Sequence, residues 1–280
     1  SKSSGPLIHF VLDTSITTRN SSEPLMHVVP YENLTPQTVL DTNIITSNSS
    51  EPVIHFVTYG SYGTIYNEEA VRLTKQANET GWFDSVTTYS EKDLPLWAAT
   101  KYKDILQLPR GGGYWIWRYP LLRKKIEEIK ENEFVLFLDS DMSFKNYSYL
   151  TDWATRLQEA NEGILFFAQP WVEEHWTTEH IFRAFNISIN NTSIRKSGQL
   201  HAGVQLLRKC HDLEDYFQLV FSVVDKDPWL ITDKYNEETK NLSVTPDFQD
   251  NRHDQSISSV AQKVRGGIIE KRIYLEDHAP

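Results

Sequence analysis

The sequence predicts an α/β fold in which helices cover a mostly parallel central sheet. Strand-like segments alternate along the chain with segments of helical periodicity, an order typical of parallel sheets. In addition, Phe134–Leu138 (FVLFL) contains no polar residue, as expected for a strand buried on both faces. The chain of 280 residues is long enough for one large domain or two small ones.

The first half of the predicted domain contains three strands and two helices. β-Branched and aromatic residues predict strands at 53–60 and 85–90, and the apolar run continues as a strand over 134–139. Helical spacing covers 67–81, with the first asparagine as N-cap and the last glycine closing the helix. A second amphipathic helix covers 119–132.

The second half continues the alternation. Helices are predicted at 152–160 and 212–224, and a third begins at Asp254. Strands are predicted at 163–169 and 198–209. The expected organisation is therefore one α/β domain with a mostly parallel sheet.

The first 51 residues differ from the rest. Val11–Val29 matches Val39–Val57 at thirteen of nineteen positions, but two copies are too few for a solenoid, which needs about three. Residues 1–51 are therefore predicted to be an N-terminal arm with an internal repeat, preceding a domain over residues 52–280. The arm is expected to be dispensable for activity.

Composition excludes several functions. The net charge of −10 argues against nucleic acid as a partner, since no basic stripe is available for phosphates. Cys210 is the single cysteine, which excludes an intrachain disulfide and suits a reducing compartment. No apolar run approaches the length of a membrane span. Asn-x-Ser/Thr sequons point the other way, although a composition rich in Asn, Ser and Thr is the simpler explanation for them. They occur at Asn20, Asn33, Asn48, Asn78, Asn146, Asn186, Asn190, Asn191 and Asn241.

Two aspartates, Asp139 and Asp141, directly follow the buried strand in EFVLFLDSDMSF. Ligands of parallel sheets bind beyond the carboxyl ends of the strands, and paired carboxylates suit Mg²⁺ or Mn²⁺. A capping turn is the structural alternative. A second copy, Asp225–Asp227, follows an amphipathic helix and is interpreted as a solvated helix terminus.

A glycine-rich segment, RGGGYWIWRYP, precedes the 119–132 helix. Glycines allow a backbone to approach a ligand closely, and a helix start favours anions. Arg118 in this segment is a candidate for contacting a diphosphate. Core packing is the more natural role for Trp115 and Trp117.

Five motifs in order, VTYGS, RGGGYWIWRYPLL, LFLDSDM, GQLHAGVQLLRK and NRHDQSISSV, resemble GT-A-type glycosyltransferases with a DXD motif. The resemblance covers about Val53 to the C-terminus and is greatest to enzymes with which bacteria and large algal (chlorella) DNA viruses decorate surface or capsid glycans. It implies a Rossmann-like GT-A domain that transfers a sugar from a nucleoside diphosphate, a UDP-sugar, to a glycan hydroxyl. UDP-xylose is the donor that the resemblance suggests, as for a capsid-glycan xylosyltransferase. The triple glycine and Arg118-Tyr119-Pro120 depart slightly from the pattern.

The resemblance also implies site residues. Mn²⁺ or Mg²⁺ would be held by Asp139 and Asp141 and completed by His278, with Asp277 as a rival. The expected donor-binding residues are Thr58, Tyr59, Gly60, Arg118, Asp139, Ser140, Asp141 and His201. The alternatives are an ordinary turn at the strand end for residues 58–60 and a core role for His201. A viral enzyme would work in the host cytoplasm; the alternative is a lumenal Golgi domain whose anchor has been removed.

Inversion at the sugar would require a general base. Asp254 is the first candidate and Asp250 the second; an N-cap aspartate without a catalytic role is the structural alternative for Asp254. Trp171 and Gln199 are candidates for contacting the acceptor glycan.

Two other classes of protein remain as alternatives. A phosphohydrolase of the haloacid dehalogenase type also carries Asp-x-Asp after an apolar strand, but on its first strand. The threonine or valine that follows in its motif, Asp-x-Asp-x-Thr/Val, is replaced here by Ser143. A non-catalytic carbohydrate-binding protein is suggested by the eight tryptophans.

Overall fold

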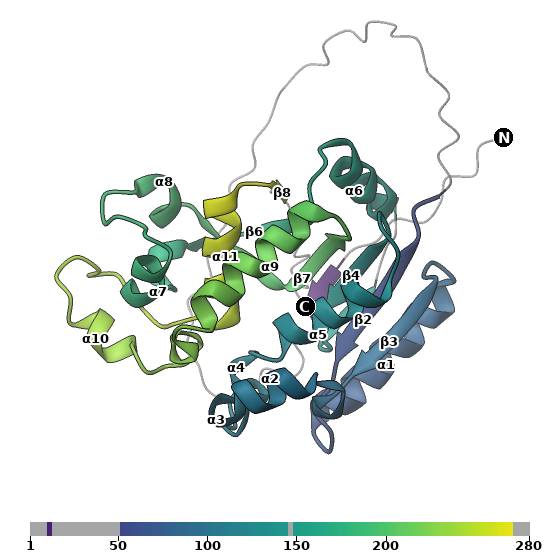
Figure 1. Cartoon of the computed structure of the whole chain (residues 1–280), viewed down its shortest axis with the longest axis horizontal. Helices are drawn as coiled ribbons and strands as arrows, with labels where there is room; N and C mark the ends of the chain where they lie inside the picture. The colour runs from purple at the N-terminus through teal and green to yellow at the C-terminus, as the bar shows by residue number, and fades with distance from the viewer. Residues whose placement is uncertain (1–9, 13–50, 145–147, 271–280) are drawn as a thin grey trace, which may run out of the picture.

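The computed structural model describes residues 10–12, 51–144 and 148–270 (Figure 1). The strands, α-helices and 3-10 helices (η) of these residues are, in chain order, β1 (Phe10–Leu12), β2 (Ile54–Tyr59), α1 (Ile65–Thr80), β3 (Ser85–Tyr89), η2 (Glu91–Asp93), α2 (Leu96–Lys101), α3 (Lys103–Leu106), α4 (Gly111–Tyr114), α5 (Arg118–Glu128), β4 (Phe134–Leu138), β5 (Met142–Phe144), α6 (Ser148–Glu159), β6 (Ile164–Val172), η3 (Glu173–His175), α7 (Glu179–Ala184), α8 (Thr192–Arg195), β7 (Gly198–Arg208), α9 (His211–Val224), η4 (Pro228–Ile231), α10 (Asn236–Lys240), α11 (Asp254–Arg265) and β8 (Ile268–Glu270).

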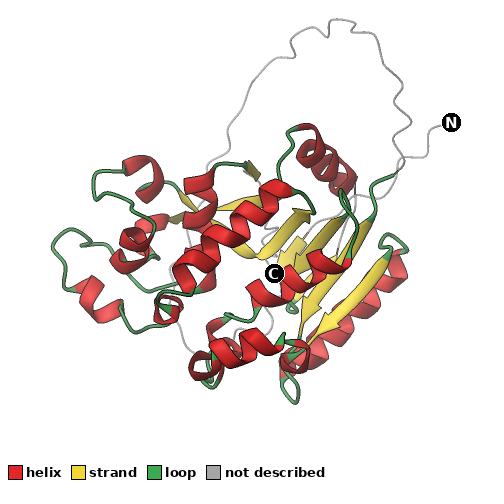
Figure 2. Ribbon diagram, in the orientation of Figure 1, coloured by secondary structure: helices red, strands yellow, loops and turns green. Residues whose placement is uncertain are grey.

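The centre of the fold is a six-stranded sheet with the order β3-β2-β4-β7-β6-β8 (Figure 2). β3, β2 and β4 pair in parallel, and so do β6 and β8. β7 is antiparallel to both of its neighbours, β4 and β6. The predicted α/β class with a mostly parallel sheet is confirmed.

Helices cover both faces of this sheet (Figure 1). Val135 and Phe137 belong to a core shared with residues of α5, α9 and α11. Phe134, Leu136 and Leu138 belong to a second core shared with residues of α1 and α6. Because alternate residues of a strand point to opposite faces, β4 must be apolar throughout, which explains the run that the sequence shows.

Several element boundaries differ from the prediction. The N-cap of α1 is Thr64 rather than Asn67, although Gly81 closes the helix in the left-handed conformation as expected (φ 66°). The predicted 119–132 helix ends at Glu128, because Ile129 is already extended. β6 runs on to Val172, and α6 begins at Ser148.

The expected N-terminal arm contributes one described element. β1 pairs antiparallel with β5, and Leu12 lies opposite Met142. The remainder of residues 1–50 lies outside the described residues. Residues 271–280 also lie outside them, and with these the predicted metal ligand His278 and its rival Asp277. Within the described residues, no helix is both long and apolar enough to cross a bilayer.

Candidate active site

The ends of two strands meet the middle of a third at the candidate site. β2 and β4 are parallel neighbours, so their carboxyl ends lie together, and β7 runs past them in the opposite direction. Thr58 Oγ1 donates a hydrogen bond to the carbonyl oxygen of Leu138 (2.9 Å). The amide of Asp139 donates to the carbonyl oxygen of Gly203 (2.9 Å). These bonds fix the start of the Asp139–Asp141 turn between the ends of the two parallel strands, where open α/β sheets bind ligands.

The two aspartates flank a turn that α1 holds in place. Arg72 of α1 donates from Nη2 to the carbonyl oxygens of Ser140 (3.1 Å) and Met142 (2.7 Å). Ser140 itself is buried. A guanidinium bonded to the carbonyls on both sides of Asp141 leaves little freedom to the backbone that carries this carboxylate.

The two carboxylates lie close enough to influence one another. Burial raises the pKa of Asp141 to about 6, and the negative charge of Asp139 adds to this shift. Asp139 instead forms an ion pair with Arg118, Oδ1 to Nη2, at 2.6 Å. Among the described residues, no ion pair compensates Asp141. A cation beside this carboxylate would therefore be electrostatically favourable.

Arg118 is the buried cation at the centre of the site. It is only 2% exposed, at the start of α5, and its guanidinium contacts two carboxylates, Asp139 through Nη2 and Asp254 through Nη1. The guanidinium also lies over the rings of Phe137 and Trp117. Its Nε has no hydrogen-bond acceptor among the described residues, so one donor of the fork is unused.

Asp254 is the first residue of α11 and is 4% exposed. Burial raises its pKa to about 7, against the opposing effect of Arg118. The backbone carbonyl of the same residue accepts from Tyr119 Oη (2.8 Å), which lies 3.1 Å from Ser258 Oγ. α5 and α11, far apart in sequence, are thus joined at their first turns by an ion pair and a hydrogen bond.

His201 and Gly203 of β7 complete the site beside Asp139. A Cβ added to Gly203 would lie 2.4 Å from Asp139 Oδ2 and 2.7 Å from His201 Cε1, so only glycine leaves room for both side chains. His201 Nδ1 accepts from the amide of Gly203 (3.0 Å), and burial lowers the pKa of this imidazole to about 4. The neutral ring therefore carries its proton on Nε2 and can donate it to a ligand.

The nucleoside residues predicted at the end of β2 lie against the glycine-rich segment. Tyr59 stacks on Trp117, with ring centroids 3.6 Å apart. Gly60 packs tightly on α1, because a Cβ there would lie 2.7 Å from Ala70 Cβ. Trp117 Nε1 donates to the carbonyl oxygen of Gly111 (2.9 Å). Trp117 is buried, which agrees with the predicted packing role.

The remaining predicted residues lie elsewhere. Gln199 is fully buried, and its amide bonds to Glu173, Thr177, Ser256 and Gln255, so it is used inside the protein. Trp171 is half-buried near the end of β6 and packs edge-on against Trp176.

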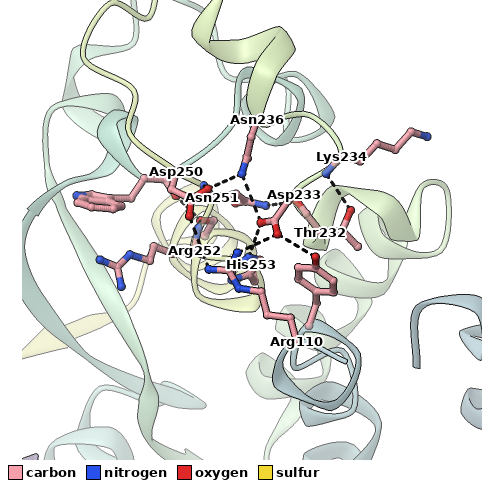
Figure 3. Close-up of polar contacts among 12 residues, drawn as sticks. Arg110, Thr232, Asp233, Lys234, Asn236, Asp250, Asn251, Arg252 and His253 are labelled. Carbon is pink, nitrogen blue, oxygen red and sulfur yellow. Dashed lines mark hydrogen bonds and ion pairs between the residues drawn. The ribbon is translucent and has the colours of Figure 1, made fainter. Parts of the chain in front are cut away.

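Asp250 does not belong to the same group of contacts as Asp254. It accepts from the side chain of Asn236 and from the amide of Asn251 (3.0 Å), in a separate polar cluster around Asp233 (Figure 3). The second Asp-x-Asp copy is structural: Asp225 accepts from Tyr102 Oη (2.6 Å). Its other member caps η4, as an aspartate at a helix start commonly does.

The residues present fit a divalent cation. Asp139 and Asp141 supply hard oxygen donors, and Mg²⁺ is commonly bound by one or two carboxylates together with substrate phosphates. No group of three or more His, Cys, Asp or Glu side chains that could hold a metal occurs in the part of the chain that the structure describes. The remaining ligands would therefore come from the phosphates, from water, or from His278, which lies outside that part.

Sequence reasoning missed two residues. Arg72 occupies an ordinary position in an amphipathic helix, and nothing in its spacing shows that it reaches the aspartate turn. Asp233 follows a 3-10 helix in a polar stretch without a motif. Both act through contacts distant in sequence.

No protein-family model matches the chain, and no curated protein matches it. Among solved structures, it is similar to a glycosyltransferase involved in the glycosylation of the major capsid of PBCV-1, with 15% identity, a TM-score of 0.34, and coverage of 79% of this chain and 82% of the other. It is also similar to the apo form of mouse xyloside xylosyltransferase 1, with 12% identity, a TM-score of 0.39, and coverage of 79% and 85%. Both similarities are low, so nothing about the site is carried over from either protein.

Proposed function

We propose that this protein is a metal-dependent glycosyltransferase that moves a sugar from a nucleoside diphosphate to a hydroxyl of a glycan. The observation that carries the proposal is the constellation at the carboxyl edge of β2 and β4. Two adjacent carboxylates, Asp139 and Asp141, lie beside the buried guanidinium of Arg118. The five motifs that resemble GT-A-type enzymes include these three residues.

The chemistry requires charge neutralisation. A diphosphate leaves a sugar only if its developing negative charge is stabilised. Asp139 and Asp141 would hold Mn²⁺ or Mg²⁺, which acts as a Lewis acid on the phosphates. Arg118, which is held between Asp139 and Asp254, would supply a fixed second positive charge. His201 would donate its Nε2 proton to a sugar hydroxyl.

Asp254 is the proposed general base, if the reaction inverts the sugar. A pKa of about 7 suits proton abstraction at neutral pH. Asp250 remains the second choice, and its place in the cluster around Asp233 separates it from Arg118.

The donor is proposed to be a UDP-sugar held by Thr58, Tyr59 and Gly60, with xylose as the first sugar to test. The acceptor is a glycan or glycoprotein, and Trp171 is the remaining surface candidate for contacting it. The host cytoplasm, for a viral enzyme, and the Golgi lumen are the two proposed locations.

The test is a screen of UDP- and GDP-sugars for Mn²⁺-dependent hydrolysis and transfer. Asp139→Ala and Asp141→Ala should each abolish transfer and metal-dependent UDP binding in calorimetry, while circular dichroism stays that of the wild type. Asp225→Ala is the control, since this aspartate belongs to the second, structural copy. Full activity in either site variant would refute the metal role.

The same screen separates the alternative functions. Hydrolysis of phosphate monoesters without any response to sugar nucleotides would favour the phosphohydrolase. That class carries its aspartate pair on the first strand, whereas Asp139 here follows β4. Tight glycan binding that is indifferent to nucleotide and metal would favour a carbohydrate-binding protein.

A further inference from the structure

Backbone strain is concentrated at one place in the described chain. Six non-glycine residues there have positive φ, and three of them are asparagines, which tolerate this conformation. The other three are Tyr114 (φ 53°), Trp115 (φ 60°) and His253 (φ 60°, ψ −124°). Bulky residues adopt such conformations only where surrounding contacts enforce them, and such strain clusters at functional sites.

The three strained residues form one cluster although they come from two distant segments. The ring of His253 lies 5.3 Å from that of Trp115, nearly parallel to it, and 5.0 Å from that of Tyr114. Tyr114 and Trp115 end a run of positive φ that starts at Gly111, so the segment labelled α4 is a left-handed turn and not a right-handed α-helix.

One carboxylate, Asp233, joins both segments (Figure 3). Its Oδ2 accepts from Tyr114 Oη and from Arg110 Nη1, both at 2.8 Å. Its Oδ1 lies 2.9 Å from His253 Nε2. Burial opposes ionisation of Asp233, but the hydrogen bonds from His253 and Tyr114 outweigh it and hold its pKa well below the usual range.

The two joined segments lead directly into the site. The left-handed turn ends three residues before Arg118, and His253 immediately precedes Asp254. We propose that Asp233 is a positioning residue: by holding the turn and His253 together, it sets the first turns of α5 and α11 so that Arg118 meets both Asp139 and Asp254. The expected effect on kcat rests on the proposed function. The expected effect on the structure rests on the contacts alone.

Asp225 provides a matched control. Like Asp233 it accepts from a tyrosine hydroxyl, Tyr102 (2.6 Å), and pairs with a cation, Lys101 (2.6 Å). The exposed fractions of the two side chains are also alike, 33% for Asp225 and 35% for Asp233. Asp225 joins the end of α9 to α2, away from the strained cluster.

The experiment compares Asp233→Ala, Asp233→Asn and Asp225→Ala in the full chain, at a temperature where circular dichroism shows each to be folded. Asp233→Ala is expected to lower kcat about 100-fold with little change in the donor KM, because a misplacement of about 1 Å costs that much. Asp233→Asn keeps an acceptor for Tyr114 and Arg110 and should lose less. Asp225→Ala should retain kcat. Wild-type kcat in Asp233→Ala, or an equal loss in Asp225→Ala, would overturn the proposal.

Crystal structures of the wild type and Asp233→Ala give a second readout. The turn at 111–115 should relax in the variant, and the contact between Arg118 Nη1 and Asp254 Oδ2 should be lost while the sheet superposes. An unchanged turn and ion pair would contradict positioning by Asp233. If the wild type transfers no sugar from any donor, the proposed function fails, but this structural comparison still decides the role of Asp233.

Discussion

At the residue scale, Gly203 shows how a missing side chain makes room for a carboxylate. An added Cβ would lie 2.4 Å from Asp139 Oδ2 and 2.7 Å from His201 Cε1, too close for either atom. The pairing of β7 with β4 fixes this approach, since the carbonyl of Gly203 accepts from the amide of Asp139. Strand glycines often mark such close contacts.

Gly203→Ala is therefore expected to displace Asp139 and to weaken Mn²⁺-dependent UDP binding at least tenfold, a free-energy change of about 1.4 kcal/mol. Calorimetric titration of UDP with and without Mn²⁺ would measure it. In urea denaturation, the double variant with Asp139→Ala should lose less stability than the sum of the two single variants, because removing the carboxylate leaves room for the added Cβ. Additive losses would show that Gly203 acts elsewhere.

Asp254 makes a prediction about pH. Burial raises its pKa to about 7, and a general base works only when deprotonated. The kcat/KM of transfer should consequently rise with pH through about 7 and level off above it. Asp254→Asn should bind donor normally but lose transfer at every pH. Normal turnover in this variant would place the base elsewhere.

At the scale of elements, the site consists of helix starts and turns whose positions are set by contacts with neighbouring elements. Two helices, α5 and α11, each present a first-turn residue to the other through the Arg118–Asp254 ion pair. The turn between β4 and β5 is held by Arg72 of α1. Each charged group therefore sits on an element whose position a neighbouring element determines.

Arg72→Ala is expected to loosen the aspartate turn. A hydrogen bond from a charged donor contributes at least about 1.5 kcal/mol to stability. We expect this lower value because the guanidinium of Arg72 is partly exposed. Stability in urea should fall by about this amount, and the affinity for Mn²⁺ with UDP should fall with it. Lys75→Ala is the control on the same helix, since Lys75 is exposed and its ion pair is with Glu79 of the same helix. Equal effects of the two variants would show that Arg72 does not hold the aspartate turn in place.

At the scale of the whole molecule, the N-terminal arm is connected to the site. The sequence predicts that residues 1–51 are dispensable, yet β1 pairs with β5, and β5 begins directly after Asp141. The arm therefore supplies the backbone partner of the strand that follows the aspartate turn. Its contribution is local, since β1 does not belong to the six-stranded sheet.

Two deletions test this connection. Removing residues 1–9 leaves β1 in place and should retain transfer and metal-dependent UDP binding. Removing residues 1–51 should weaken both, because β5 loses its partner and the turn before it is less restrained. Equal activity of the two proteins would confirm the original expectation of a dispensable arm.

Local patterns in the sequence were enough to predict the class of the fold and the location of the aspartate pair. The alternation of elements and the unbroken apolar strand at 134–138 are local patterns, and burial on both faces requires them. The start of a helix at Asp254 and the glycine closing α1 followed from local chemistry as well. Boundaries at Thr64 and Glu128 were missed, because capping and packing shift helix ends by a few residues.

Which charged side chains pair with one another could not be predicted without the three-dimensional fold. Arg118 and Asp254 are 136 positions apart, and no periodicity relates them. Gln199 is polar and was expected to face a glycan, but it is buried in a hydrogen-bonded network. Asp233 has no motif and yet joins two segments of the site. Local propensity depends on a few neighbouring residues. The site, in contrast, contains side chains that are distant in sequence, and their charges and pKa values depend on how close the fold places them to one another.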